Sequence, residues 1–253
     1  MDVLDNGGHA PIHYAALASS PDCMDLLIKW KCNPNLSNLT RENPLHFACS
    51  YQNDARYIKP LLMAGAFVDE FSGVGRTPLL YATRQDHAIA AGFLLENYAD
   101  INLSDWKGMT PLHVAVGKSS VKVLRLLLEC RANYKLKDYS GCNIAHVAAL
   151  SANKEVVKLL KETDLTGLDV LSVNNDGYTA MDLLNRRKEI HPEFIRIFKD
   201  WLTSFEQVVD VSTPSLSSLK EEILVDELSD ENDDGDDDSD LCFKDALEYQ
   251  PKP

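Results

Sequence analysis

Four histidines at one repeated position are the first residues in this sequence whose chemistry stands out. His13, His46, His113 and His146 are separated by 33, 67 and 33 residues. Imidazole nitrogens bind transition metals and transfer protons near neutral pH, so a regular set of histidines invites a metal or acid–base interpretation. Equivalent residues of a stacked repeat, however, lie about 10 Å apart, too far for several of them to bind one ion. The spacing therefore predicts a structural role for these histidines.

Motifs of the common enzyme classes are absent from the sequence. We find no G-x-S-x-G, no H-E-x-x-H, no P-loop and no G-x-G-x-x-G pattern. The neighbouring acids at 236–238 fall in an acid-rich stretch that the composition predicts to be disordered, where carboxylates are not held in place for acid–base work. We predict that the protein is not an enzyme and that it uses no cofactor and no metal.

The six cysteines do not form a recognisable framework. None of them stands in a C-x-x-C pair, which argues against a zinc site or a set of disulfides. We interpret them as reduced thiols of a cytoplasmic or nuclear protein. The sequence also shows no N-terminal signal segment and no apolar run near 18 residues, so neither secretion nor a membrane partner is predicted.

The histidines belong to a repeated unit whose best-formed copy is DWKGMTPLHVAV at Asp105–Val116. Gly108 adopts a positive φ without steric cost, so Asp105–Gly108 is expected to form a tight turn. Thr110 is placed to cap a helix through its hydroxyl group. Pro111 suits the first helical position, where its missing N–H costs nothing. The unit therefore predicts a turn followed by a short helix.

The same unit recurs with a nearly constant period. The proline or its substitute stands at Pro11, Pro44, Pro78, Pro111, Ile144 and Ala180. The residue before it is Ala10, Asn43, Thr77, Thr110, Asn143 or Thr179, so five of the six copies keep a side chain that can cap a helix. A second signature follows in four copies: LLIKWKCNPN at Leu26–Asn35, LLMAGAFVD at Leu61–Asp69, LLENYADIN at Leu94–Asn102 and LLECRANYK at Leu127–Lys135. A fixed period near 33 residues predicts stacked supersecondary units.

Both signatures together resemble the ankyrin repeat over roughly residues 1–205. The resemblance implies an all-α solenoid of about six helix pairs joined by short β-hairpin loops, in which the repeated histidine forms hydrogen bonds between neighbouring turns. We expect an ankyrin-repeat domain at 1–205, with repeats at roughly 1–37, 38–71, 72–104, 105–137, 138–173 and 174–205. A disordered acidic tail at 206–253 is expected to follow.

Individual copies depart from the pattern. Arg41 replaces the turn glycine at some backbone cost, and Pro60 interrupts the second helix of the second repeat. Leu80 stands where other copies have histidine. In the first repeat, Ile12, Tyr14, Met24 and Leu27 are expected to lack a neighbour on one side, either because the chain is cut from a longer array or because a partner or a second copy covers them. The apolar stripe from Phe194 to Phe205 predicts a last helix that caps the stack, or else a free surface helix that binds a partner or a membrane.

Charge is distributed unevenly along the chain. Residues 1–205 contain 22 Lys and Arg against 23 Asp and Glu, whereas residues 206–253 contain 3 against 16. The repeats therefore offer no basic excess for binding nucleic acid directly. The acidic tail is interpreted either as a solubilising segment or, because apolar residues interrupt its acids, as an interaction segment.

What remains is a surface, which we expect to bind another protein. In the resembled family, partners bind along the hairpin tips and the concave inner-helix face. Matching these positions selects Tyr51, Phe71, Arg76, Arg84, Gln85, Trp106, Lys107, Met109, Lys118 and Tyr139. An aromatic row of Phe71, Trp106 and Tyr139 beside cations has the composition of a binding hot spot, since Trp, Tyr and Arg are enriched there. The alternative is that these rings brace neighbouring hairpins.

Three functions are consistent with these features. The leading hypothesis is a non-enzymatic scaffold or adaptor that binds an unidentified protein. The second is a regulatory, possibly nuclear, factor that acts through its acidic tail, and the third is the repeat-sensor end of a larger multidomain protein. The tail is also a candidate for an intramolecular contact with Arg76, Arg84, Lys107 and Lys118, which would block the surface until a partner displaces it.

Overall fold

The computed structural model describes residues 2–187 and 191–206. It divides the chain into two units, Met1–Phe198 and Lys199–Pro253. The described residues contain twelve helices and no β-strand. The predicted acidic tail lies outside the described residues, apart from the final residue of the last helix.

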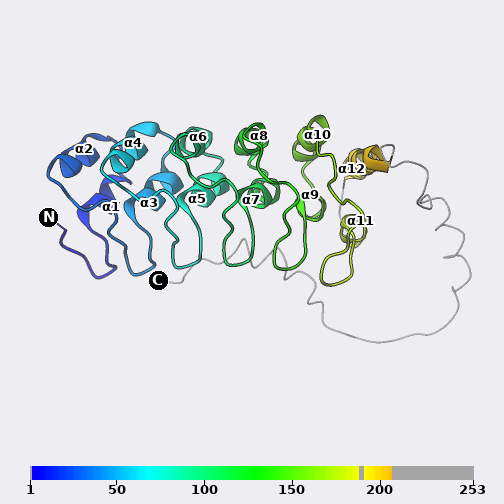
Figure 1. Ribbon diagram of the computed structural model, residues 1–253, viewed down its shortest axis with the longest axis horizontal. Coiled ribbons are helices and arrows are strands. Elements are labelled where there is room, and N and C mark those ends of the chain that lie inside the picture. The colour runs from blue at the N-terminus through cyan, green and yellow to red at the C-terminus, as the bar shows by residue number, and fades with distance from the viewer. Residues whose placement is uncertain (1, 188–190, 207–253) are drawn as a thin grey trace, which may run out of the picture. The chain divides into compact units, whose positions relative to one another are not determined.

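The helices of the first unit form two layers (Figure 1). The inner helices follow the loops directly and are α1 (Pro11–Ala15), α3 (Pro44–Tyr51), α5 (Pro78–Arg84), α7 (Pro111–Lys118), α9 (Ile144–Ser151) and α11 (Ala180–Asn185). The outer helices are α2 (Asp22–Lys29), α4 (Ala55–Met63), α6 (Ala88–Glu96), α8 (Val121–Glu129) and α10 (Lys154–Glu162), and α12 (Pro192–Glu206) crosses into the second unit. From α3 to α11 each inner helix packs on the next, and from α2 to α10 each outer helix does the same. This is the six-repeat helical solenoid that the sequence predicts.

Five inner helices begin with the side-chain cap predicted for them. The capping oxygens of Asn43, Thr77, Thr110, Asn143 and Thr179 each accept a hydrogen bond from a backbone N–H in the first turn of α3, α5, α7, α9 and α11. Ala10 has no side chain that can do so, and α1 is only five residues long. The caps satisfy backbone donors that a short helix leaves without partners.

The core lies between the two layers. The same inner-helix position is filled by Leu45, Leu79 and Leu112, which are at most 1% exposed, and the outer helices add Ile58 and Leu124 at 0%. Burying a side chain of this size stabilises the fold by about 1.5–3 kcal/mol. Each repeat therefore buries apolar side chains between its own two helices and against its neighbours.

The loops keep the predicted hairpin turn but not strand pairing. In the fourth repeat the loop is closed by hydrogen bonds from the N–H of Asp105 to the carbonyl of Met109, at 3.1 Å, and from the N–H of Gly108 to the carbonyl of Asp105, at 2.9 Å. Gly108 has a φ of 76°, and at the equivalent position Arg41 has a φ of 57°. The backbone cost predicted for Arg41 is thus present in the structure.

Two expectations about the first and second repeats are revised. Ile12 and Met24 are 1% and 0% exposed, because the second repeat covers them, so they are not the unpaired residues. The exposed apolar side chains of the first repeat are Val3, Leu4, Tyr14, Leu17, Leu26 and Trp30. Pro60 lies within α4, which continues from Ala55 to Met63 despite it.

The last helix carries buried aromatic residues. The rings of Phe194 and Phe198 stack with centroids 5.7 Å apart, and both side chains are buried. Trp201 is also buried, at 1% exposed. The apolar stripe predicted for this helix is therefore present.

We expect Thr110→Ala to lower the free energy of unfolding by about 1–2 kcal/mol, because the N–H of His113 at the start of α7 loses its acceptor. Urea unfolding measures the change. The exposed Ser37→Ala serves as a control, with an expected change within about 0.5 kcal/mol. Ala10→Ser, which supplies the missing cap of α1, should raise stability; equal stability of Thr110→Ala and the wild type would contradict the importance of these caps.

Candidate protein-binding surface

The repeated histidines of the first, second and fifth repeats link their repeat to the next one. In the first, second, fourth and fifth repeats, the ring Nδ1 accepts a hydrogen bond from the backbone N–H at the helix cap, over 3.0–3.4 Å. The Nε2 atoms of His13, His46 and His146 lie 3.1–3.2 Å from carbonyl oxygens of the following repeat, on Glu42, Arg76 and Tyr178. A ring that accepts at Nδ1 carries its proton on Nε2 and donates from there. Within the described residues no group of histidines, cysteines and carboxylates is arranged to hold a metal ion.

Burial keeps these histidines neutral. His46 and His113 are 1% and 0% exposed, and burial lowers the pKa of each to about 4. Burial also lowers the pKa of His13 and of His146. Each ring is therefore a neutral structural group at physiological pH.

The third repeat has Leu80 in place of the histidine, and other contacts hold its junction with the fourth repeat. Leu80 is 0% exposed. The guanidinium Nε of Arg76 lies 3.9 Å from a carboxylate oxygen of Asp105. A Cβ atom added to Gly75 would lie 2.1 Å from Cδ1 of Trp106, so the indole ring covers the tip of the third loop. The Arg76–Asp105 pair and the Trp106 ring thus connect the third repeat to the fourth, in addition to the packing of α5 on α7.

The closing hydrogen bonds fix which loop residues are equivalent. In the second to fifth repeats, the N–H that donates this hydrogen bond belongs to Asn38, Ser72, Asp105 and Asp138. The next residue in each loop is therefore Leu39, Gly73, Trp106 or Tyr139. Phe71 precedes its turn residue, so it is not equivalent to Trp106 and Tyr139 and the predicted aromatic row is out of register. Phe71 is 37% exposed at the edge of the loop.

Trp106 and Tyr139 contact the preceding loop and also face solvent. A Cβ atom added to Gly108 would lie 2.7 Å from Cδ1 of Tyr139. The N–H of Tyr139 donates to the carbonyl of the exposed Lys107 at 3.0 Å. Trp106 nevertheless remains 64% exposed and Tyr139 71%. The contact with the preceding loop therefore leaves most of each ring exposed.

Met109 does not belong to the exposed set. Its side chain is 4% exposed, because its backbone closes the loop against Asp105 and turns the side chain inward. We therefore remove Met109 from the candidate surface.

Three cations form a group on the third and fourth repeats, which we call the cationic cluster: Arg76, Arg84 and Lys118. Burial, followed by the charge of Arg76, lowers the pKa of Arg84. Burial, followed by the charges of Arg84 and Arg76, lowers the pKa of Lys118. Gln85 is exposed beside Arg84 at the end of α5. The structure thus brings together three of the cations selected from the sequence.

An aromatic group on the first two repeats was not selected from the sequence, apart from Tyr51. The ring of Phe47 lies 6.1 Å from that of Tyr51, measured between centroids, and 5.5 Å from that of His9. The ring of Tyr14 lies 5.7 Å from that of His9, and the hydroxyl of Tyr14 donates to Asp5. Tyr51 is 63% exposed and Tyr14 52%. The available signal was that Tyr14, Phe47 and Tyr81 all stand three residues after the repeat proline.

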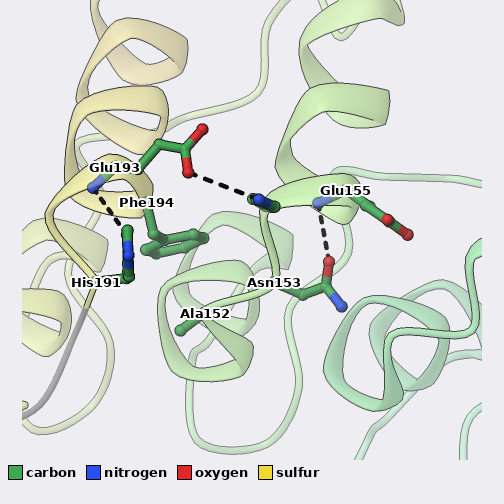
Figure 2. A pocket seen from close by; sticks show the side chains of 7 residues that line it. Ala152, Asn153, Glu155, His191, Glu193 and Phe194 are labelled. Atoms are coloured by element: carbon green, nitrogen blue, oxygen red, sulfur yellow. Dashed lines mark hydrogen bonds and ion pairs between the residues drawn. The ribbon is translucent and has the colours of Figure 1, made fainter.

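A separate cleft of about 470 Å³ lies between the start of α12 and the junction of α9 with α10 (Figure 2). Its lining includes Phe194 and an ion pair of 3.6 Å between Lys154 and Glu193. The side chain of Asn153 caps α10. The ion pair and the helix cap account for these polar side chains. The cleft is separate from the loop tips and inner-helix ends described above.

Comparison with known families identifies the fold. The family model for three copies of the ankyrin repeat matches residues 1–72 and residues 45–138. The chain belongs to the ankyrin-repeat family. Ankyrin repeats are protein–protein interaction modules, and the exposed loop tips and inner-helix ends described above are part of such a module.

Similar proteins share only part of their length with this chain. It is 31% identical over 96 residues to an ankyrin repeat protein of fowlpox virus, covering 37% of this chain and 13% of that protein. It is 31% identical over 98 residues to the E3 ubiquitin-protein ligase KEG of Arabidopsis thaliana, covering 38% and 6%. It is 34% identical over 80 residues to protein phosphatase 1 regulatory subunit 27 of Mus musculus, covering 31% and 50%. The chain thus matches at most half the length of these curated relatives.

The ankyrin-repeat solenoid shows no candidate membrane span. Within the part of the chain that the structure describes, every helix is too short or too polar to cross a bilayer.

We expect the stability of the ankyrin repeats to fall as the pH falls from about 6.5 towards 4. Over this window the unfolded chain binds protons at His46 and His113 that the folded protein excludes, since both folded pKa values lie near 4 and the ordinary value is 6.5. Urea unfolding at pH 7.0 and pH 5.5 should differ by about 1 kcal/mol for each histidine. His113→Gln should reduce this difference, whereas exposed His191→Gln should retain it; an unchanged difference in His113→Gln would contradict the buried neutral ring.

We expect Gly75→Ala to destabilise the protein more than Gly177→Ala. Both glycines have a positive φ, 70° and 81°, but only at Gly75 does the added methyl group meet a ring; nothing lies within 4 Å of it at Gly177. The backbone strain alone costs about 1–2 kcal/mol, and displacement of Trp106 adds to it. In a Trp106→Ala background the excess should disappear, as a double-mutant cycle by urea unfolding will show. The same excess in both backgrounds would exclude the bracing contact.

Proposed function

We propose that this ankyrin-repeat protein is a non-enzymatic adaptor or scaffold that binds another protein through one surface. We call this surface the binding face; it comprises Tyr51, Arg76, Arg84, Gln85, Trp106, Lys107, Lys118 and Tyr139. The observation that carries the proposal is that aromatic and cationic side chains gather at loop tips and inner-helix ends while the residues beneath them are buried. Phe71, at the edge of its loop, is a peripheral member.

The exposure of the aromatic side chains supports this proposal. Tyr51, Trp106 and Tyr139 are 63%, 64% and 71% exposed, although each is large enough to contribute substantially to an interface. Tyr, Trp and Arg dominate binding hot spots because they bury much area with few rotatable bonds. Loop contacts that already hold Trp106 and Tyr139 reduce the entropy lost when a partner binds.

The proposal also covers the domain boundaries, the cellular location and a contact made by the tail. We place the ankyrin-repeat domain at 1–205 and the acidic tail at 206–253, and we infer a location in the cytoplasm or nucleus. We also propose that the acids of the tail contact the cations of the binding face until a partner displaces them. The supporting feature is the charge of the tail, with 3 basic against 16 acidic residues.

A second candidate is a regulatory factor whose output comes from the tail. The same charge imbalance favours it, because twelve acidic residues and no basic residue stand between 221 and 240. Replacing these acids by neutral residues in the full chain separates the two functions. An adaptor keeps its partner after the change, whereas a tail-driven regulator loses its output.

We expect the binding-face variant Tyr51→Ser, Trp106→Ser and Tyr139→Ser to lose its protein partners. Affinity capture from cell extract followed by mass spectrometry compares it with the wild type. The matched control is the outer-edge variant Met63→Ser, Phe67→Ser and Tyr98→Ser, whose parent side chains are 78%, 60% and 92% exposed. Removing one hot-spot aromatic typically costs about 2 kcal/mol or more of binding free energy.

Folding must be checked in both variants, because Trp106 also covers the third loop. Circular dichroism and urea unfolding show whether each variant keeps the helical solenoid. Partners lost from the binding-face variant alone, with the fold retained, support the proposed function. Partners lost equally from both variants, or from neither, contradict it.

A further inference from the structure

The cationic cluster concentrates positive charge on a solenoid that is otherwise nearly neutral. Arg76 precedes α5, Arg84 ends it, and Lys118 ends the neighbouring helix α7. The helices α5 and α7 pack directly on each other. Each of the three side chains is partly buried, so their mutual repulsion is less screened than on an open surface.

The carboxylates near this cluster have other partners as well. Asp105 lies 3.9 Å from Arg76 through one oxygen, and its other oxygen accepts the N–H groups of Lys107 and Met109. Glu42 accepts the hydroxyl of Tyr81 and, at 2.9 Å, the hydroxyl of Thr40. Asp105 offsets part of the positive charge but is already used in closing its loop. An added carboxylate from outside would therefore stabilise all three cations.

The aromatic side chain of Tyr51 lies at a defined distance from the cationic cluster, measured along the stacked inner helices. Tyr51, Gln85 and Lys118 each stand seven residues after their repeat proline, so they occupy equivalent positions at the C-terminal ends of three successive inner helices. Packed helices lie about 8–10 Å apart, which places Tyr51 roughly 16–20 Å from the position of Lys118. An extended peptide covers that distance with roughly five or six residues.

We propose that the cationic cluster binds the carboxylates of an extended acidic segment in a partner protein, and that an apolar residue of the same segment, about six positions away, rests on Phe47 and Tyr51. The proposal rests on the proposed function and specifies the partner's chemistry. The apolar end accounts for the exposed Tyr51 beside the half-buried Phe47, and the acidic end accounts for the three cations held together. A nucleic acid is disfavoured, because the repeats carry 22 basic against 23 acidic residues and provide few cations to neutralise a series of phosphates.

A fluorescent peptide tests this directly with the full chain. The probe is a fluorescein-labelled twelve-residue peptide that carries one phenylalanine, a neutral spacer of five residues and three glutamates. Fluorescence anisotropy should show binding that weakens with added salt, and a peptide with glutamine in place of glutamate should bind at least roughly tenfold more weakly. Moving the phenylalanine next to the glutamates should also weaken binding.

The protein variants are matched in charge. Arg84→Gln with Lys118→Gln removes one arginine and one lysine from the cluster, and Lys122→Gln with Arg125→Gln removes the same two types from the exposed face of α8. The first pair should weaken binding of the acidic probe roughly tenfold or more, and the second pair less than about twofold. Lys118→Gln alone, which leaves the more buried Arg84 in place, should show an intermediate loss.

The tail is a competing acidic segment, and a further variant accounts for it. Replacing Asp233, Asp234, Asp236 and Asp237 by asparagine in the full chain should tighten binding of the probe, because fewer acids then compete for the cluster. Unchanged affinity would exclude the tail contact without affecting the partner chemistry.

Several outcomes would overturn the proposal. Equal binding by the two charge variants, equal binding of the glutamine peptide, or tighter binding of a single-stranded oligonucleotide of the same charge each contradicts an acidic peptide ligand. These results are distinguishable from failure of the adaptor function. Loss of captured partners from the binding-face variant, together with unaltered probe binding in the cluster variant, would retain the function and reject the ligand chemistry.

Discussion

The structure depends on a buried, neutral histidine that joins two hydrogen bonds. Its Nδ1 accepts from the cap of its own helix, and its Nε2 reaches a carbonyl of the following loop, as in His46 and Arg76 at 3.1 Å. An imidazolium could not accept at Nδ1, so the link requires the neutral ring. Burial supplies that state by lowering the pKa. The histidine pattern in the sequence invites a catalytic interpretation. Burial instead keeps each ring neutral and engaged in structural hydrogen bonds.

The junction between the third and fourth repeats lacks this histidine and contains charged and aromatic side chains instead. Between the third and fourth repeats, Leu80 fills the space and Arg76 pairs with Asp105. Trp106 covers Gly75 there. Asp105 is only 7% exposed, whereas Trp106 is 64% exposed, so at this junction incoming groups can reach the ring rather than the charged pair. A contact that stabilises the stack and part of the proposed binding face thus meet at Trp106.

Features that follow from single residues or from the repeat period could be predicted from the sequence. Features that depend on how a loop closes, or on contacts between repeats, could not. The caps at Asn43 and Thr110 and the strained Arg41 followed from the chemistry of single residues, and the fold followed from the repeat period. Met109 and Phe71 were misplaced, because a residue's direction in a loop depends on the closing hydrogen bond. The approach of Lys118 to Arg84 and the contacts of Phe47 with His9 and His13 arise between repeats, so they cannot be predicted from any single repeat.

The distribution of charge sets the range over which a partner is recognised. Because the repeats are close to neutral, with 22 basic against 23 acidic residues, they exert little long-range attraction on a charged protein. At physiological salt the field of the cluster also decays over about 8 Å. An acidic segment must therefore be brought to the cluster by its apolar contacts, after which the partly buried cations strengthen and orient it. Selectivity then comes from the spacing between aromatic and cationic side chains, which the rigid stacking of the helices maintains.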